Sequence, residues 1–175
     1  RHEKQFLLFN GKSYKEVSDE VVKAEIFHFY SIVKPNDSFT RGVYNVFCDL
    51  VNVPHIEIGS WLRGGRKTHD MIVFNNGIFD ITSDTPVFEP PTQDFFTFNE
   101  LEYDYDATAR CDTWLEFLNV SVADVDAIKM LQEYMGYCLT KNTLFQKFLL
   151  LFGKSRAGKG LITDIITLMV GKSNI

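Results

Sequence analysis

Eight residues, Gly153-Lys-Ser-Arg-Ala-Gly158-Lys159-Gly160, have the types and spacing of a phosphate-binding loop. In the pattern G-x-x-x-x-G-K, the glycines let the backbone curl so that successive N–H groups point at one anion. The lysine adds a mobile positive charge for the β- and γ-phosphates of a nucleotide. We therefore expect Lys159 to be the catalytic cation. The residues expected to bind the nucleotide are Gly153, Ser155, Ala157, Gly158, Lys159, Gly160 and Leu161.

The residues on either side of this loop predict the strand and the helix that must position it. The apolar run at residues 147–152, KFLLLF, has the length and composition of a buried parallel strand. Residues 161–170, LITDIITLMV, predict a helix with Leu161, Ile165 and Leu168 on one face and Gly171 at its end. The N-terminus of that helix would direct its positive dipole at the bound phosphate.

Gly160 departs from the usual form of this motif, in which Ser or Thr follows the lysine and binds Mg²⁺. Thr163 is too far along the helix to substitute directly. We expect ATP and Mg²⁺ as the ligands. Without the hydroxyl, either Mg²⁺ is bound through water, or a later acidic motif binds it, or catalysis is weak. No metal site made of protein ligands is expected, because the four histidines are scattered and His55 with Glu57 lacks a third ligand.

ATP hydrolysis needs more than a phosphate loop. It also needs an acidic strand that handles Mg²⁺ and water, a polar sensor and usually an arginine from a neighbouring subunit. In such folds these elements follow the loop, and few residues follow it here. Together with the initial Arg1, this leads us to expect that the chain is part of a longer protein and inactive alone.

Composition restricts the classes of partner. Of the 175 residues, 45% are hydrophobic and 23% are charged, which is ordinary for a folded globular protein. The net charge of −5 excludes a general basic field that would attract nucleic acid. A local contact is conceivable in the glycine-rich loop after Trp61, where the candidate DNA-binding residues are Arg63, Arg66 and Lys67. The favoured alternative is a solvated loop with Trp61 in the core.

The cysteines and the hydropathy pattern predict a cytoplasmic protein. Cys48, Cys111 and Cys138 are far apart and odd in number, so we expect reduced thiols rather than disulfides. No apolar run reaches the roughly 18 residues that a membrane-spanning helix needs, so no membrane partner is expected. If a phage or plasmid encodes the chain, the compartment is the cytoplasm of the bacterial host.

The first 90 residues predict an α+β region. Residues 5–17 read as a hairpin with Asn10-Gly11 at the turn, and residues 71–81 as a second hairpin that turns at 75–77. Between them, Ser18 should begin a helix that runs to about Val33. Asp37 or Ser38 should cap another, over residues 39–52, whose apolar stripe we interpret as a core face.

The middle of the chain changes character after a proline-rich connector at residues 84–94, a candidate domain boundary. Residues 107–120 and 121–140 predict helices, the second beginning with a capping box formed by Ser121 and Asp124. Their apolar stripes predict a small helical bundle. We therefore divide the chain into an α+β region at 1–90, a mainly helical linker or collar at 91–145, and the start of a P-loop ATPase domain at 146–175.

Three stretches together resemble the replicative primase–helicases of phages, plasmids and poxviruses, whose motors belong to helicase superfamily 3. VFNNGIFDIT, at Val73 to Thr82, is similar to the family's N-G-x-x-D hairpin. Residues Phe95 to Leu118 are similar to its strand, Tyr-Asp-Tyr-Asp and tryptophan-containing segment. Leu131 to Gly160 looks like its helix, its Gly-Tyr-x-Leu-Thr corner and the run into the phosphate loop. The resemblance covers roughly residues 65–175.

This resemblance implies a fold and an activity. The residues before about 145 would be a linker and collar, and the motor would begin near Gln146 as the first strand–P-loop–helix unit of an α/β, AAA+-like ATPase. Such motors form rings, commonly homo-hexamers, around DNA, here expected to be single-stranded, and bind ATP between subunits. Gly153, Gly158 and Lys159 would hold phosphate, and a primase or polymerase domain often precedes the motor in the same polypeptide.

Two alternatives to the helicase remain. The chain could be a non-catalytic oligomerisation or DNA-loading module with a vestigial phosphate loop, which the missing hydroxyl would suit. It could also be a small-molecule P-loop kinase, although such kinases need substantial sequence after the loop. Binding of ATP would argue against the first alternative, and phosphoryl transfer to a nucleotide would support the second.

Overall fold

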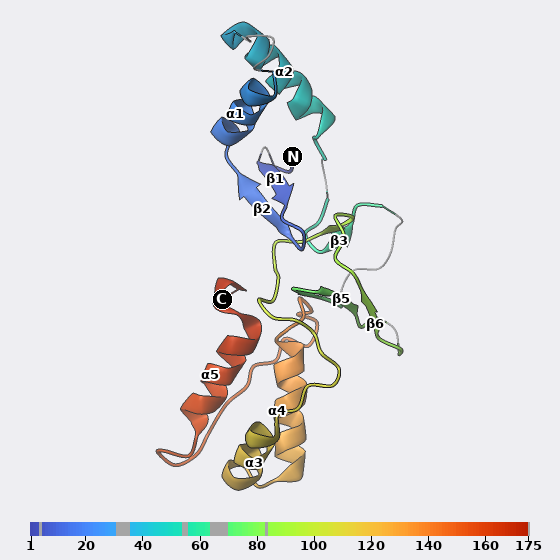
Figure 1. Ribbon diagram of the computed structural model, residues 1–175. Coiled ribbons are helices and arrows are strands. Elements are labelled where there is room, and N and C mark those ends of the chain that lie inside the picture. Colours follow the sequence, from blue (N-terminus) through green and yellow to red (C-terminus); the bar gives the residue numbers. More distant parts are fainter. Residues whose placement is uncertain (4, 31–35, 54–55, 64–69, 83, 175) are drawn as a thin grey trace. The chain divides into compact units, whose positions relative to one another are not determined.

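The computed structural model describes residues 1–174 apart from residues 4, 31–35, 54–55, 64–69 and 83. It shows a mixed α+β chain with small antiparallel sheets (Figure 1), so the expected α+β character is confirmed. The chain forms two compact units, and each unit is made of two separate stretches of the sequence. Unit 1 comprises Arg1–Arg66 and Thr92–Phe98, and unit 2 comprises Lys67–Pro91 and Asn99–Ile175.

Unit 1 begins with the expected hairpin of β1 (Phe6–Phe9) and β2 (Tyr14–Val17), paired from Phe6↔Val17 to Phe9↔Tyr14. The Asn10 side chain holds the turn by accepting hydrogen bonds from the backbone N–H groups of Lys12 and Ser13, both at 2.9 Å. A second, short pair joins β3 (Ser60–Trp61) to β7 (Phe95–Phe96). Phe6, Phe95 and Phe96 form the buried apolar centre of this unit.

Two helices complete unit 1, α1 (Asp19–Phe29) and α2 (Asp37–Leu50). Ser18 caps α1 as expected. The cap of α2 is Asn36, whose Oδ1 accepts from Phe39 N–H at 2.8 Å, and not Asp37 or Ser38. Asparagine is as good a cap as either, so the preference of residue types could not distinguish the three positions. Tyr44 donates to Asp19 at 2.6 Å and links the helices, a hydrogen bond that raises the pKa of Tyr44.

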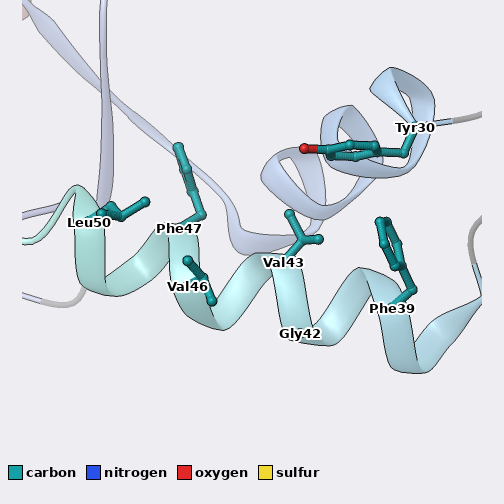
Figure 2. A pocket seen from close by; sticks show the side chains of 7 residues that line it. All are labelled: Tyr30, Phe39, Gly42, Val43, Val46, Phe47 and Leu50. Carbon is teal, nitrogen blue, oxygen red and sulfur yellow. The ribbon is translucent and has the colours of Figure 1, made fainter.

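The apolar stripe of α2 is only partly covered. Its residues line an open groove of about 560 Å³ (Figure 2), formed by Tyr30, Phe39, Gly42, Val43, Val46, Phe47 and Leu50. Phe47 also stacks on Phe6, whereas Leu50 is 77% exposed. The interpretation of this stripe as a core face therefore holds for one edge of it only. Tyr30 supplies the one polar side-chain group in the lining, so the groove has no evident chemistry.

Unit 2 contains an antiparallel sheet in the order β4–β5–β6, made of β4 (Met71–Phe74), β5 (Gly77–Asp80) and β6 (Val87–Glu89). The expected hairpin is present, but Gly77 pairs with Phe74 inside the ladder, so the turn is Asn75-Asn76 alone. The side-chain amide of Asn76 both donates to the carbonyl of Tyr105 and accepts from its N–H, at 2.9 Å each. The turn thereby fixes the chain that leads to the helices.

The helices of unit 2 are α3 (Asp112–Ser121), α4 (Val125–Tyr137), α5 (Lys159–Val170) and the short 3₁₀ helix η2 (Lys172–Asn174). They share a core of Leu118, Leu131, Met135 and Ile162, so the predicted helical cluster is confirmed. The cap of α4 is Asp124, which accepts from Ala127 N–H at 2.9 Å, while Ser121 is the last residue of α3. The predicted capping box is therefore replaced by a one-residue cap.

Of the two elements expected around the loop, the helix is confirmed by α5 (Lys159–Val170) and the strand is wrong in the described structure. Residues 147–152 form no strand, because no described strand lies beside them to pair with their backbone. They do alternate: Leu149 and Leu151 pack on the helical core, and Phe148, Leu150 and Phe152 are exposed. In α5 the buried residue is Ile162, and Leu161 and Leu168 are exposed. Gly171 ends α5 as expected, with a φ of +84°.

Candidate phosphate-binding loop

The loop at residues 153–160 is closed by its own lysine. Lys159 Nζ donates to the carbonyl oxygen of Gly153 at 3.0 Å and to that of Lys154 at 2.7 Å. These two bonds join the beginning of the loop to its end across five and six residues. The structure therefore brings Gly153 and Lys159 together.

Gly158 makes the turn from the loop into α5. It is the N-cap of the helix and has a φ of +81°, in the left-handed region where a side chain would be strained. No side chain caps α5, and its first turn contains no acidic residue. The helix N-terminus thus keeps its partial positive charge, to which Lys154, Arg156 and Lys159 add formal charges within the same loop. This combination favours an anion.

The other predicted contacts lie at the surface. Ser155, Ala157 and Gly160 are not buried, and Leu161 is 46% exposed at the start of α5. A side chain at Gly153 or at Gly160 would meet no atom within 4 Å, so both positions border open space. These observations fit an ATP phosphate group, which the backbone N–H groups and Lys159 would hold.

The position after Lys159 offers no side-chain ligand for Mg²⁺. Gly160 has no side-chain oxygen, and the Thr163 hydroxyl donates to the Gly160 carbonyl at 2.7 Å and contacts the Lys159 carbonyl at 3.3 Å. Thr163 therefore stabilises the first turn of α5. This geometry agrees with the expectation that Thr163 does not substitute for the missing hydroxyl.

Segments far from the loop in sequence anchor α5 at both ends. Near its C-terminus, Tyr103 donates its hydroxyl proton to the Met169 carbonyl at 2.9 Å, and burial raises the pKa of this phenol. Asn174, in η2, donates to the Glu100 carbonyl at 2.9 Å. At the other end the ring of Phe117, from α3, lies against Gly158. The sequence offered no signal for this last contact, because 117 and 158 belong to no common local pattern.

The candidate nucleic-acid residues are only partly described. Arg63 is exposed, and its Nε lies 3.6 Å from Oδ1 of Asp94. Arg66 and Lys67 lie outside the described residues. Trp61 is half-buried and packs on the buried Phe95 with ring centroids 5.2 Å apart, so the interpretation of Trp61 as a core residue holds in part. Of the three candidates, Arg63 can therefore be assessed here, and it already has an acidic partner.

The rest of the described chain was compared with the requirements of a metal site and of a membrane-spanning helix. In the part of the chain that the structure describes, no three side chains of His, Cys, Asp or Glu gather closely enough to hold a metal ion. None of the described helices is long and apolar enough to cross a membrane. The loop at 153–160 is therefore the feature of the described chain with the clearest chemistry.

Comparison with known families adds an independent observation about the segment that leads to the loop. Residues 65–122 match the family described as D5 N terminal like. This domain occurs in D5-like primase–helicase proteins of phages and plasmids. No curated protein matches the chain. The match covers about a third of the chain, and we call residues 65–122 the D5-like segment.

The D5-like segment includes the sheet β4–β5–β6 and α3, and it stops before α4 and the phosphate loop. It also contains Tyr103 and Phe117, which contact the two ends of α5. The resemblance seen in the sequence is thus supported for residues 65–122, at the level of a D5-like primase–helicase region. The phosphate loop lies outside the matched residues.

Proposed function

We propose that the chain is part of an ATP-dependent replicative DNA helicase, within a phage or plasmid primase–helicase, and that residues 153–160 bind the triphosphate of ATP. The D5-like segment would belong to the linker and collar, and the residues from about 146 onward would begin the P-loop motor.

The observation that carries this proposal is the geometry of Lys159. The Lys159 ammonium bridges the Gly153 and Lys154 carbonyls close to an uncapped helix N-terminus, and this combination of positive charges supports a phosphate site. The loop also follows a D5-like segment in the same chain, which supports a helicase over other classes of nucleotide-binding protein.

DNA and a ring assembly belong to the same proposal. Single-stranded DNA would be the partner, and a homo-hexameric ring would complete each ATP site from the neighbouring subunit. The net charge of −5 requires local DNA contacts, for which Arg63, Arg66 and Lys67 remain the candidates. Native mass spectrometry of the complete polypeptide with ATP would test the ring.

The central test is Lys159→Ala. In this chain the substitution should weaken ATP binding, measured by calorimetry, roughly tenfold to a hundredfold, because a charge-assisted hydrogen bond to phosphate is lost. In the complete polypeptide it should abolish ATP hydrolysis. Undiminished hydrolysis in that variant would contradict the assignment.

Lys129→Ala is the matched control. Lys129 lies on α4 in the same unit, with its side chain 75% exposed beside Glu133. Its removal changes the net charge of the chain by the same amount as Lys159→Ala. ATP binding should be unchanged in this variant, so a loss in both variants would indicate a nonspecific electrostatic effect and not a phosphate site.

A non-catalytic oligomerisation or loading module is the second candidate. Two observations favour it: Gly160 has no side chain, and the Thr163 hydroxyl donates to the Gly160 carbonyl. Neither residue then offers Mg²⁺ a free side-chain oxygen at the start of α5. This candidate requires that the chain and the complete polypeptide both fail to bind ATP. Calorimetry on the wild-type protein distinguishes the two.

A further inference from the structure

Phe117 of α3 lies in direct contact with the glycine that begins α5. A Cβ atom built on Gly158 would lie 2.6 Å from Cζ of Phe117 and 2.8 Å from its Cε2. Both separations are far below the van der Waals contact of two carbon atoms. The edge of the phenyl ring therefore occupies the space that a side chain at position 158 would need.

This contact acts on the residue that determines the geometry of the loop. Gly158 is both the last loop glycine before the lysine and the N-cap of α5, and its φ is +81°. The backbone at this point sets the direction in which Lys159 leaves the loop. A ring packed against Gly158 restricts the movement of this backbone, and a restricted site loses less entropy when it binds a ligand.

Phe117 is itself held in place from two sides. Trp114, one turn earlier on α3, stacks on it with a centroid separation of 5.4 Å and an interplanar angle of 21°. The next residue, Leu118, is fully buried in the core that includes Ile162 of α5. The ring therefore packs against a hydrophobic cluster to which α3 and α5 both contribute, and Figure 1 labels the two helices.

We propose that Phe117 is a positioning residue for the phosphate site, and that its ring holds Gly158, and hence Lys159, in the conformation that binds phosphate. The inference rests on the proposed function, because it concerns the affinity of the same loop. It makes a residue of the D5-like segment part of the nucleotide site. Phe117 need not touch the ligand.

Two substitutions perturb the contact in opposite directions. Phe117→Leu keeps an apolar side chain and removes the ring edge from Gly158. Phe117→Tyr keeps the ring and adds an oxygen to Cζ, the ring atom that lies nearest to Gly158, so that it pushes against the loop. If positioning matters, both variants bind tripolyphosphate and ATP roughly fivefold or more weakly than wild type in calorimetry.

Ile128→Val is the matched control. Ile128 belongs to the same hydrophobic cluster but lies on α4. This variant should lower the melting temperature to a degree comparable with Phe117→Leu and leave the affinity for tripolyphosphate unchanged. If the role of Phe117 is purely structural, all three variants will have a changed melting temperature and the affinity of wild type. That result would overturn the inference.

The remaining outcomes separate the inference from the function on which it rests. If wild type binds tripolyphosphate and both Phe117 variants bind it equally well, the proposed function stands and the positioning role fails. If wild type does not bind tripolyphosphate, the proposed function fails, and the inference with it. If Phe117→Leu does not fold, Phe117→Tyr decides, because it removes no core volume.

Discussion

Lys159 illustrates how a single residue limits the affinity of the proposed site. Its ammonium group donates to the carbonyls of Gly153 and Lys154. A phosphate that draws this group toward itself exchanges at least one bond to a neutral carbonyl for a stronger bond between two charged groups, so part of the gain is offset. The backbone N–H groups and the helix N-terminus would supply the rest of the affinity.

Glycine is required at position 77 for a different reason, because β6 leaves no space for a side chain there. A Cβ atom there would lie 2.4 Å from the backbone oxygen of Glu89 and 2.5 Å from Cζ of Phe88. Gly77→Ala should therefore force β5 and β6 apart and lower the free energy of unfolding by about 1–3 kcal/mol, the usual range for overpacking. Urea denaturation followed by circular dichroism measures this change.

Gly136→Ala is the control for this prediction. Gly136 lies in α4 of the same unit, and a Cβ atom there would meet nothing within 4 Å. Because alanine favours helices over glycine, the variant should be as stable as wild type or more stable by up to about 1 kcal/mol. Equal stability of Gly77→Ala and wild type would mean that β6 does not lie against β5 as described.

At the scale of elements, the sequence predicts best where one residue type permits only one local structure. Asn10-Gly11 and Asn75-Asn76-Gly77 indicate their hairpins because few residues tolerate tight turns. The position of Gly77 within the ladder was missed, because the Asn-Asn-Gly pattern does not show whether the glycine turns or pairs with Phe74. The helix α5 and its end at Gly171 were also predicted, but which face it buries was not. The helix is apolar on several faces, so periodicity alone could not choose Ile162 over Leu161.

Residues 147–152 show why an apolar run does not by itself make a strand. Leu149 and Leu151 face the helical core in the alternation that a strand would give. A strand also requires hydrogen bonds from a neighbouring strand, and the described part of the chain offers none beside these residues. Pairing is a tertiary property, so the sequence could predict the alternation but not the ladder.

The cap of α4 provides a test at this scale, because sequence and structure select different residues. Asp124 accepts from Ala127 N–H, whereas the capping-box pattern assigned this role to Ser121. Asp124→Ala should therefore lower the free energy of unfolding by about 1 kcal/mol, the usual value of a lost cap. Ser121→Ala should change it by less than about 0.5 kcal/mol. The opposite order in urea denaturation would restore the capping box and contradict the structure.

At the scale of the whole molecule, the two units contain interleaved segments of the chain. Thr92–Phe98 belongs to unit 1, between two segments of unit 2. The division into regions 1–90, 91–145 and 146–175 stays a prediction, because compactness alone does not define a functional domain. The candidate site also depends on this long-range organisation. Phe117 reaches Gly158 only after α3 and α5 have packed together, which no local pattern reports.

Net charge is the other whole-molecule property that bears on function. At −5, with an isoelectric point near 5.3, the chain as a whole repels a polyanion. Binding of single-stranded DNA by this chain would have to depend on a few local cations and should weaken steeply as salt is added. Arg63 is the described member of the candidate set, and its ion pair with Asp94 reduces the charge that it offers.

Arg63→Ala should therefore weaken binding of single-stranded DNA and reduce the magnitude of the salt dependence, d log K/d log[salt], by about 0.7, the contribution of one phosphate contact. Fluorescence anisotropy over a series of salt concentrations measures both quantities. Arg110→Ala is the control, because Arg110 is similarly exposed and likewise paired with an aspartate, Asp112, but lies outside the candidate loop. If the two variants lose affinity equally, the effect comes from net charge, and Arg63 makes no specific contact with DNA.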